Sequence, residues 1–163
     1  IFHSHPYPDG PAQKKLRAKS IEFIKKNGHF HYIKQLFPKL FPPDFLSSNG
    51  FLVDKMMHRA SSFPAAGIIG GQRAMMNRPD QSEVLMEIKC PVLFILGRED
   101  NLISTEQRFE QTALPEVAHI HALAGVGHMG MFEAPKETQK IINQFLKYCI
   151  EFPFEDSEKT LQD

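Results

Sequence analysis

The sequence has few cysteines, no excess of either charge and no long apolar run. Only two cysteines, Cys90 and Cys149, occur in 163 residues, which excludes the disulfide framework of a small secreted protein. Both fall on predicted apolar faces, so we expect buried, reduced thiols and a cytoplasmic protein. Lysine and arginine (19) balance aspartate and glutamate (19), so no net charge favours nucleic acid or an anionic membrane. No apolar run approaches the ~20 residues of a membrane span, and no signal peptide is visible.

The sequence also lacks an initiator methionine. It opens with Ile1-Phe2, within a stretch (1–5) that is typical of a β-strand, whereas the exposed start of a domain is usually polar. We therefore expect a piece of a longer protein whose upstream part is missing. Hydrophobic residues make up 42% of the chain and charged residues 23%, as in ordinary globular domains, and the length suits one domain with a real core.

Residues 11–87 show helical periodicity and no convincing strand. The apolar spacing predicts four helices and a short amphipathic segment, over residues 12–27, 29–40, 49–62, 64–77 and 81–87. The first helix is rich in lysine. We interpret its charges as a solvated face, because neither interleaved aromatic residues nor a second basic element supports nucleic-acid binding.

From residue 88 onward, strand and helix patterns alternate. The pattern predicts a strand at 92–96, a helix at 104–112 capped by Ser104, a strand at 117–123 and a helix from 135 to 152. The first strand is continuously apolar, which is typical of a parallel strand covered on both faces. The last helix carries a broad apolar stripe, expected to pack on the sheet, made of Ile141, Ile142, Phe145, Leu146, Cys149 and Ile150. The alternation predicts an α/β fold with a parallel sheet.

Chemically useful side chains follow both strands. Gly97 ends the first strand, and Arg98, Glu99 and Asp100 come directly after it. His128 lies in a glycine-flanked loop after the second strand. Open α/β sheets place their chemistry at the carboxyl ends of the strands, so an acid and a histidine are expected to meet there. Such a pair is two-thirds of a nucleophile–His–acid triad.

The run from Ile88 to Asp100, IKCPVLFILGRED, together with GVGH at 125–128, resembles the C-terminal third of the α/β-hydrolase superfamily. In that family the strand ends in G-x-x-D, which supplies the triad acid, and the loop after the next strand carries the triad histidine. The segment EAP at 133–135 resembles the usual opening of the last helix. The segment 71–80 resembles the junction between a helical cap and the core in small esterase-like members.

The resemblance implies an α/β fold that is the C-terminal portion of an α/β-hydrolase. A mostly parallel sheet would be flanked by helices and would carry a helical cap insertion. The implied divisions are 1–10 (core strand and loop), 11–87 (helical cap), 88–152 (C-terminal core with acid and histidine) and 153–163 (polar tail).

The sequence departs from the family in one respect. The nucleophile elbow G-x-S-x-G does not occur in it, and neither Ser4 nor Ser104 has the elbow's context. The resemblance therefore implies that nucleophile and oxyanion hole lie upstream of this chain, which by itself would have little or no activity. A missing N-terminal half, a companion chain or a homodimer would cover the open edge of the sheet.

The resemblance assigns roles to two residues. His128 would be the general base and then the general acid, and Asp100 would orient it and stabilise the imidazolium. Two other carboxylates remain open as the acid. Glu99 is the neighbour of Asp100, and Asp9 follows the first strand, where some members carry their acid.

Three H-x-H pairs offer a rival interpretation, a metal site. They lie at 3/5, 29/31 and 119/121, and on a strand two such side chains face the same way. No cysteine or acid accompanies them at zinc-like spacing, so we expect neither a metal nor a cofactor. Several methionines in the predicted cap and just beyond His128 fit either an adaptable apolar pocket or ordinary core filling.

Two classes of function follow. The first is hydrolysis of a small ester or similar bond in an apolar pocket, with a small, apolar substrate and no nucleic-acid or membrane partner. The second is a non-catalytic binding or interaction module on a degenerate hydrolase scaffold, because a fold does not dictate a function. A Ser elbow upstream would indicate esterase-like chemistry, and an Asp there would indicate dehalogenase or epoxide hydrolase chemistry.

Overall fold

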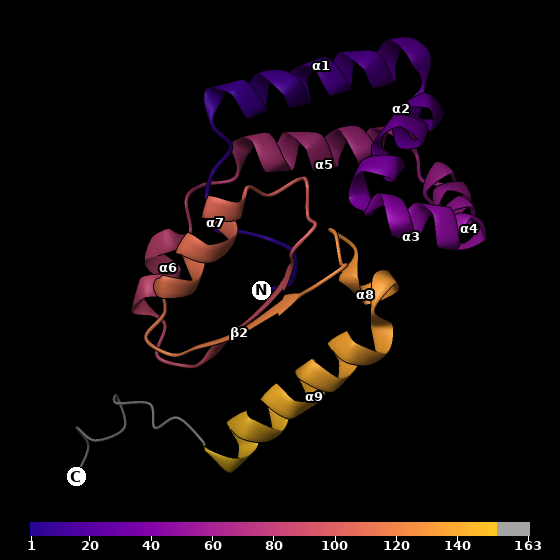
Figure 1. Ribbon diagram of the computed structural model, residues 1–163. Coiled ribbons are helices and arrows are strands. Elements are labelled where there is room, and N and C mark those ends of the chain that lie inside the picture. Colours follow the sequence, from indigo (N-terminus) through magenta and orange to yellow (C-terminus); the bar gives the residue numbers. More distant parts are fainter. Residues whose placement is uncertain (153–163) are drawn as a thin grey trace. The chain divides into compact units, whose positions relative to one another are not determined.

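The computed structural model describes residues 1–152 (Figure 1). The chain folds into two compact units. The first, called the helical unit, is Pro6–Gln81. The second, called the sheet unit, combines Ile1–His5 with the chain from Ser82 onward. The polar tail predicted for residues 153–163 lies outside the described residues.

Helices follow one another through the helical unit. They are α1 (Pro11–Asn27), α2 (His29–Leu36), the 3-10 helix η1 (Phe37–Leu40), α3 (Pro43–Ser48), α4 (Gly50–Ser61) and α5 (Ala65–Asn77). The four helices predicted from apolar spacing are confirmed, although the helix predicted at 29–40 finishes as 3-10 helix. The periodicity does not predict α3. Pro43 discourages a helical interpretation, but it occupies the first turn, where its missing N–H costs no hydrogen bond.

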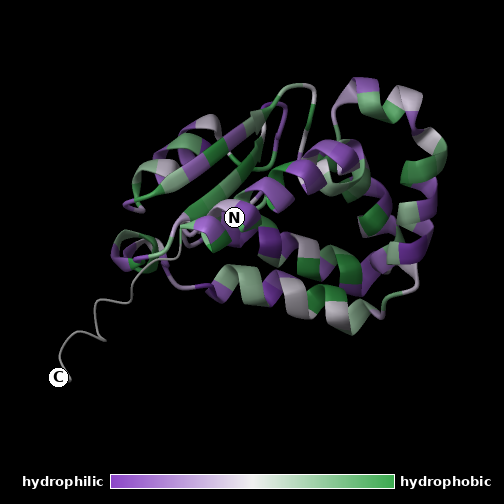
Figure 2. Cartoon of the chain, turned by 90° about the horizontal axis from the view of Figure 1, so that it is seen from below, coloured by the Kyte–Doolittle hydropathy of each residue, from purple (hydrophilic) through white to green (hydrophobic). Residues whose placement is uncertain are grey.

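The helical unit has its own apolar core. Its buried apolar side chains include Ile21, Ile24, Ile33, Phe37, Leu40, Phe41 and Val53. Hydrophobic and hydrophilic residues alternate along the helices, as amphipathic packing requires (Figure 2). The lysines of α1 are exposed, which confirms the solvated face predicted for this helix.

The sheet unit alternates strand and helix. Its elements are α6 (Ser82–Glu87), β1 (Val92–Gly97), α7 (Thr105–Glu110), the 3-10 helix η2 (Gln111–Ala113), β2 (Ala118–Leu123), α8 (Gly130–Glu133) and α9 (Pro135–Glu151). Strands β1 and β2 pair in parallel, in a register that runs from Val92↔Ala118 to Gly97↔Leu123. The hydroxyl of Ser104 accepts the Gln107 amide and caps α7. The predicted parallel sheet and α/β fold class are confirmed.

The stretch 1–5 lies on the other side of β1 but forms less regular structure than predicted. It joins β1 through one parallel bridge, Phe2 to Ile95. The His3 amide donates to the Ile95 carbonyl over 3.0 Å, and His3 then adopts a left-handed φ of 44°. That backbone turn ends the ladder, because a strand needs extended φ values. Strand β1 therefore lies between β2 and the first residues of the chain.

Strand β1 is covered on both faces, which explains its unbroken apolar run. Phe94, Ile95 and Leu96 are 0%, 1% and 2% exposed. One face packs with Leu85 of α6, and the other packs with Ile141 of α9. Burying a side chain of this size contributes roughly 1.5–3 kcal/mol, so β1 anchors the sheet unit and fixes where its carboxyl end lies.

The expectation of buried thiols is wrong. Cys90 is exposed and Cys149 is partly exposed. Cys90 lies before Pro91 and the first paired residue of β1, so the sheet does not cover it. The apolar stripe of α9 is also narrower than predicted, since Leu146 is 53% and Ile150 78% exposed. Phe145 and Tyr148 of the same turns pack against His119 of β2, so Leu146 and Ile150 lie on the side of α9 that the sheet does not cover.

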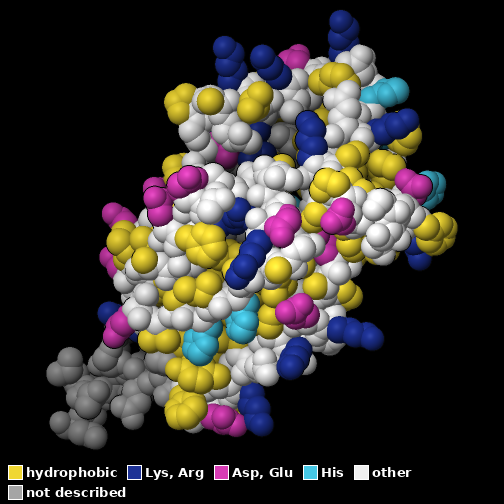
Figure 3. All heavy atoms as spheres, viewed as in Figure 1, with side chains coloured by type: hydrophobic (Ala, Val, Ile, Leu, Met, Phe, Trp, Pro, Cys, Tyr) yellow, Lys and Arg dark blue, Asp and Glu magenta, His cyan; other side chains and the backbone are white. Residues whose placement is uncertain are grey.

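The described surface carries charges of both signs. Acidic and basic side chains are interspersed on the face shown in Figure 3, as expected from equal numbers of each. Among the helices within residues 1–152, none is both long and apolar enough to span a bilayer.

Candidate active site

The acid arm of the site is built by the end of β1. After the buried strand, Gly97 begins a turn and Asp100 follows it with 5% exposure. One carboxylate oxygen of Asp100, Oδ1, accepts the amides of Leu102 and Ile103 over 2.8 and 3.3 Å. These bonds hold the second oxygen, Oδ2, in a single direction.

The loop after β2 docks directly on this turn. The Arg98 amide donates to the Leu123 carbonyl and the Glu99 amide donates to the Val126 carbonyl, both over 3.0 Å. A Cβ on Gly97 would lie 2.0 Å from the carbonyl oxygen of Gly127. Glycine is therefore required at the end of β1, because any side chain would push the histidine loop away.

This close approach brings Asp100 and His128 together. Nδ1 of His128 lies 2.9 Å from Oδ2 of Asp100. The Asp100 side chain is fully buried, whereas that of His128 is 25% exposed. A carboxylate can only accept, so Nδ1 carries the proton in this bond. Nε2 is then the ring nitrogen that can take up a proton from another group.

The environment keeps Asp100 ionised. Burial raises the pKa of the Asp100 carboxyl, but the hydrogen bond and charge of His128 and the amides of Leu102 and Ile103 outweigh it. The net effect holds the pKa of Asp100 below its ordinary value. The side chain is thus a permanent anion at neutral pH, suited to orienting an imidazole and stabilising its charged form.

The two alternative acids have other partners. The Glu99 carboxylate accepts the Gly125 amide over 2.9 Å, so it holds the loop and not the imidazole. Asp9 belongs to the helical unit, where it forms an ion pair with Arg17. Of the three carboxylates considered, Asp100 is the one that contacts His128.

Solved structures share this arrangement of strands and helices. An esterase from Thermogutta terrifontis (malate bound) matches with a TM-score of 0.82 at 20% identity, over 90% of this chain and 54% of that one. The enol-lactonase from Burkholderia xenovorans LB400 matches with a TM-score of 0.80 at 16% identity, over 90% and 55%. MenH from S. aureus matches with a TM-score of 0.76 at 17% identity, over 90% and 57%.

The chain has the fold of the C-terminal part of an α/β-hydrolase. It spans about half the length of these solved structures. At such low identities the likeness concerns the fold. No family model matches the sequence, and no curated protein matches it.

In this hydrolase fold the histidine loop is held by a residue that sequence reasoning missed, Glu133. One oxygen of its carboxylate accepts the Gly127 amide and the other accepts the Met129 amide, each over 2.7 Å. These two amides flank His128. Burial, with a smaller contribution from the charge of Asp100, raises the pKa of the Glu133 carboxyl, while the two amides lower it; the net pKa lies above the ordinary value. An acid a few residues after a loop histidine, at a helix start, is the signal that could have found it.

A second missed residue, Arg108, braces the acid arm from behind. Its guanidinium is buried and donates to the carbonyls of Gly97 and Arg98. It also donates to the Thr105 hydroxyl over 2.8 Å. Arg108 thereby ties α7 to the turn that carries Asp100. No local pattern marks this role, since an arginine in a short helix is normally a surface residue.

A third missed residue, His3, lies beneath the loop. It is 5% exposed, and its Nε2 accepts the Gly130 amide over 3.1 Å. The ring centroids of His3 and His128 are 6.1 Å apart. Burial is the main reason that the pKa of His3 falls to about 4, so the ring is neutral at pH 7.

The histidine pairs considered as metal ligands are engaged elsewhere. His119 packs against the rings of Phe145 and Tyr148. Nε2 of His29 donates a hydrogen bond to the Ser61 carbonyl over 3.0 Å. Within residues 1–152, no group of three or more His, Cys, Asp or Glu side chains could hold a metal ion.

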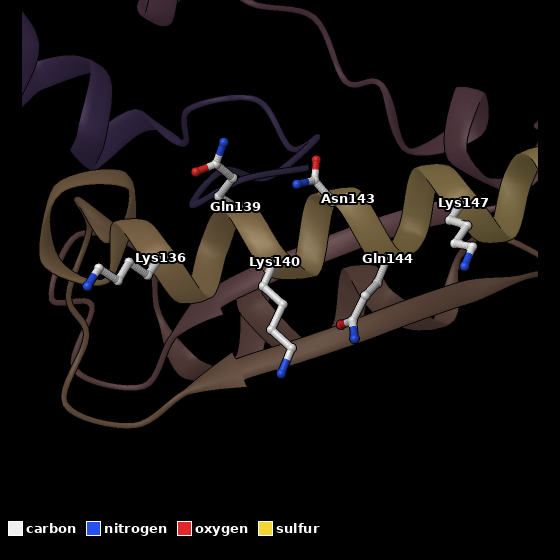
Figure 4. A pocket seen from close by; sticks show the side chains of 6 residues that line it. All are labelled: Lys136, Gln139, Lys140, Asn143, Gln144 and Lys147. Atoms are coloured by element: carbon white, nitrogen blue, oxygen red, sulfur yellow. The ribbon is translucent and has the colours of Figure 1, made fainter.

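Two surface hollows lie away from the His128–Asp100 pair. One, of about 470 Å³, lies on α9, where six polar side chains project from the helix (Figure 4). The other, of about 410 Å³, is an apolar groove beside Ile1, Phe2 and β1. No methionine lines either hollow, so a methionine-lined substrate pocket stays a prediction.

Proposed function

We propose that this chain supplies the acid and the histidine of a hydrolase that cleaves a small ester or similar bond. Asp100 is the triad acid and His128 the general base, while the nucleophile and the oxyanion hole come from residues outside this chain. The hydrogen bond between Nδ1 of His128 and Oδ2 of Asp100, at the ends of neighbouring parallel strands, carries the proposal.

The proposed chemistry follows from the orientation of the imidazole. Nε2 of His128 takes the proton of the nucleophile as the nucleophile attacks the ester carbonyl, and returns it to the leaving alcohol. Asp100 keeps the proton of the ring on Nδ1 and stabilises the imidazolium that forms. Water then repeats the cycle on the covalent intermediate, which releases the acid and restores the free nucleophile.

The nature of the bond rests on the fold and on the nucleophile. Two of the solved structures with this fold are an esterase and an enol-lactonase, which favours an ester here. A serine nucleophile supports this chemistry, whereas an aspartate would change the reaction to dehalogenation or epoxide opening. We expect a small, apolar substrate, and neither a metal nor a cofactor.

The proposal requires further chain beside the sheet unit. The apolar groove of about 410 Å³ next to Ile1 and Phe2 lies along the side of β1 away from β2. Additional strands that carry the nucleophile would extend the sheet there and cover its apolar lining. An N-terminal half, a companion chain or a second copy are the candidates.

The test is hydrolysis of p-nitrophenyl butyrate by the protein with its nucleophile-bearing part, and by the 163-residue chain alone. The protein with its nucleophile-bearing part, called the longer protein, should hydrolyse the ester. In it, His128→Ala should lower kcat by orders of magnitude while the protein stays folded. His121→Ala, a strand histidine away from the pair, is the matched control and should keep full activity. Esterase activity of the 163-residue chain that survives His128→Ala would refute the proposal. Folded longer protein without any hydrolytic activity would favour the binding module instead.

A further inference from the structure

His3 is an unusual residue to find buried under the histidine loop. It directly follows Phe2, which forms the isolated bridge to Ile95 of β1 (called here the first bridge). In the chain, His3 lies 127 positions before Gly130, the residue that it contacts. Its ring packs against Phe2 at a centroid distance of 4.8 Å. The first bridge and the loop after β2 are thus joined through one imidazole.

The contact with Gly130 defines the state of the ring. Nε2 of His3 accepts the Gly130 amide, so the ring must be neutral with its proton on Nδ1. A Cβ on Gly130 would lie 2.2 Å from Nε2. The backbone of the loop therefore rests directly on the imidazole, and only glycine permits this approach.

The position of His3 is costly in several ways. Its φ of 44° is left-handed, which is unfavourable for any residue with a Cβ. Nδ1 is buried and has no hydrogen-bond partner among the described residues. Local strain of this kind persists where surrounding structure imposes it, and it concentrates at functional sites.

The loop is held on both sides of His128. Glu133 holds the amides of Gly127 and Met129 from the α8 side, and His3 holds the next amide, that of Gly130, from the side of the first bridge. The charged groups that act on His3 are Asp100, His128 and Arg108. A positive charge on His3 would remove the acceptor for Gly130 and would also repel an imidazolium at His128.

We propose that His3 is a positioning residue for His128, acting as a neutral hydrogen-bond acceptor that sets the place of the 127–130 loop. This inference rests on the proposed function for its catalytic consequence, but the loop contact can be measured by itself. A shift of about 1 Å in the imidazole can lower a rate about 100-fold, so a loop held from one side alone loses rate without losing substrate binding.

The experiment compares variants that separate the acceptor from the shape of the ring. His3→Phe and His3→Leu remove the acceptor with two different volumes, and His3→Gln restores an acceptor at a similar distance from the backbone. His121→Phe is the control, a histidine-to-phenylalanine change on β2 of the same unit. Each is made in the protein with its nucleophile-bearing part. The readouts are hydrogen exchange of the Gly130 amide, the NMR titration of the His128 ring, and kcat and KM for p-nitrophenyl butyrate.

We expect His3→Phe and His3→Leu to speed exchange of the Gly130 amide at least about 10-fold and to lower kcat about 10- to 100-fold with little change in KM. His3→Gln should restore most of the protection of the Gly130 amide from exchange and most of kcat. His121→Phe should match the wild type in both measurements. Unchanged exchange and kcat in a folded variant without the acceptor would overturn the proposal. Equal losses in His3→Gln and His3→Phe would also overturn it, because shape and not the acceptor would then matter. The exchange measurement needs no turnover, so it decides the role of His3 even if the hydrolase proposal fails.

Discussion

Nδ1 of His128 lies 2.9 Å from Oδ2 of Asp100, although the two residues are 28 positions apart in the chain. The parallel pairing of β1 and β2 ends both strands at the same edge. Gly97 then lets the second loop approach the first turn closely enough for the bond to form. The His128–Asp100 contact therefore depends on the register of β1 with β2 and on the absence of a side chain at Gly97.

The first prediction concerns Asp100. Asp100→Asn should lower kcat about 10³- to 10⁴-fold, because the amide group presents N–H to Nδ1 and shifts the ring proton to Nε2. The amides of Leu102 and Ile103 can still be accepted by the remaining oxygen, so the protein should stay folded. Steady-state kinetics with p-nitrophenyl butyrate measures the effect. Glu99→Gln is the control, with a loss below about 10-fold; a larger loss there than in Asp100→Asn would identify Glu99 as the acid.

The second prediction concerns Glu133. Glu133→Gln places an N–H₂ group against either the Gly127 or the Met129 amide, so one charge-assisted bond is lost. The free energy of unfolding should fall by about 1–3 kcal/mol, and kcat should fall about 10-fold as the loop loosens. Urea unfolding and steady-state kinetics measure the two effects. Glu137→Gln, an exposed acid at the start of α9, should change stability by less than about 0.5 kcal/mol. Equal behaviour of the two variants would show that Glu133 does not hold the loop.

The third prediction concerns Gly97. Gly97→Ala should lower the free energy of unfolding by about 1–3 kcal/mol and should strongly reduce activity, since the added Cβ displaces the Gly127 carbonyl. Gly70→Ala is the matched control. Gly70 is in the interior of α5, and nothing lies within 4 Å of a Cβ built on it. Alanine there should raise the free energy of unfolding by about 0.5–1 kcal/mol. Thermal unfolding compares them, and a stable, active Gly97→Ala protein would contradict the close approach.

The fourth prediction concerns pH. The pKa of His3 is lowered from 6.5 to about 4, so between these values the unfolded chain binds a proton that the folded protein does not. Stability should therefore fall as pH decreases from 6.5 to 4, by up to about 3 kcal/mol from this residue. His3→Phe should remove that part of the pH dependence, and His121→Phe should keep it. Urea unfolding at pH 7, 5.5 and 4 measures the difference, and identical slopes in wild type and His3→Phe would disprove the burial of a neutral ring.

Much of the local structure could be predicted because its causes are local. The apolar run of β1 and the capping hydroxyl of Ser104 act over a few residues, and both behave in the structure as predicted. The cysteines show the limit of such reasoning. Cys90 adjoins an apolar strand, yet it is exposed because the covered part of the sheet begins after it.

The supporting residues of the site could not be predicted in the same way. Arg108, His3 and Glu133 act through backbone amides and carbonyls, and any sequence offers those groups everywhere. Which amide or carbonyl each side chain meets depends on how closely distant segments approach. His3 and Gly130 are separated by 127 positions and by the whole helical unit.

By itself the sequence determined the α/β class, the order of most of its elements, and a short set of candidate acids placed near a loop histidine, since periodicity and strand ends are properties of neighbouring residues. Only the tertiary structure shows which of Asp100, Glu99 and Asp9 contacts His128. There Asp100 meets the imidazole, Glu99 meets the Gly125 amide and Asp9 meets Arg17. The physical reason is that a hydrogen bond is short and directional, so which carboxylate bonds His128 depends on the close approach of the two strand ends around Gly97.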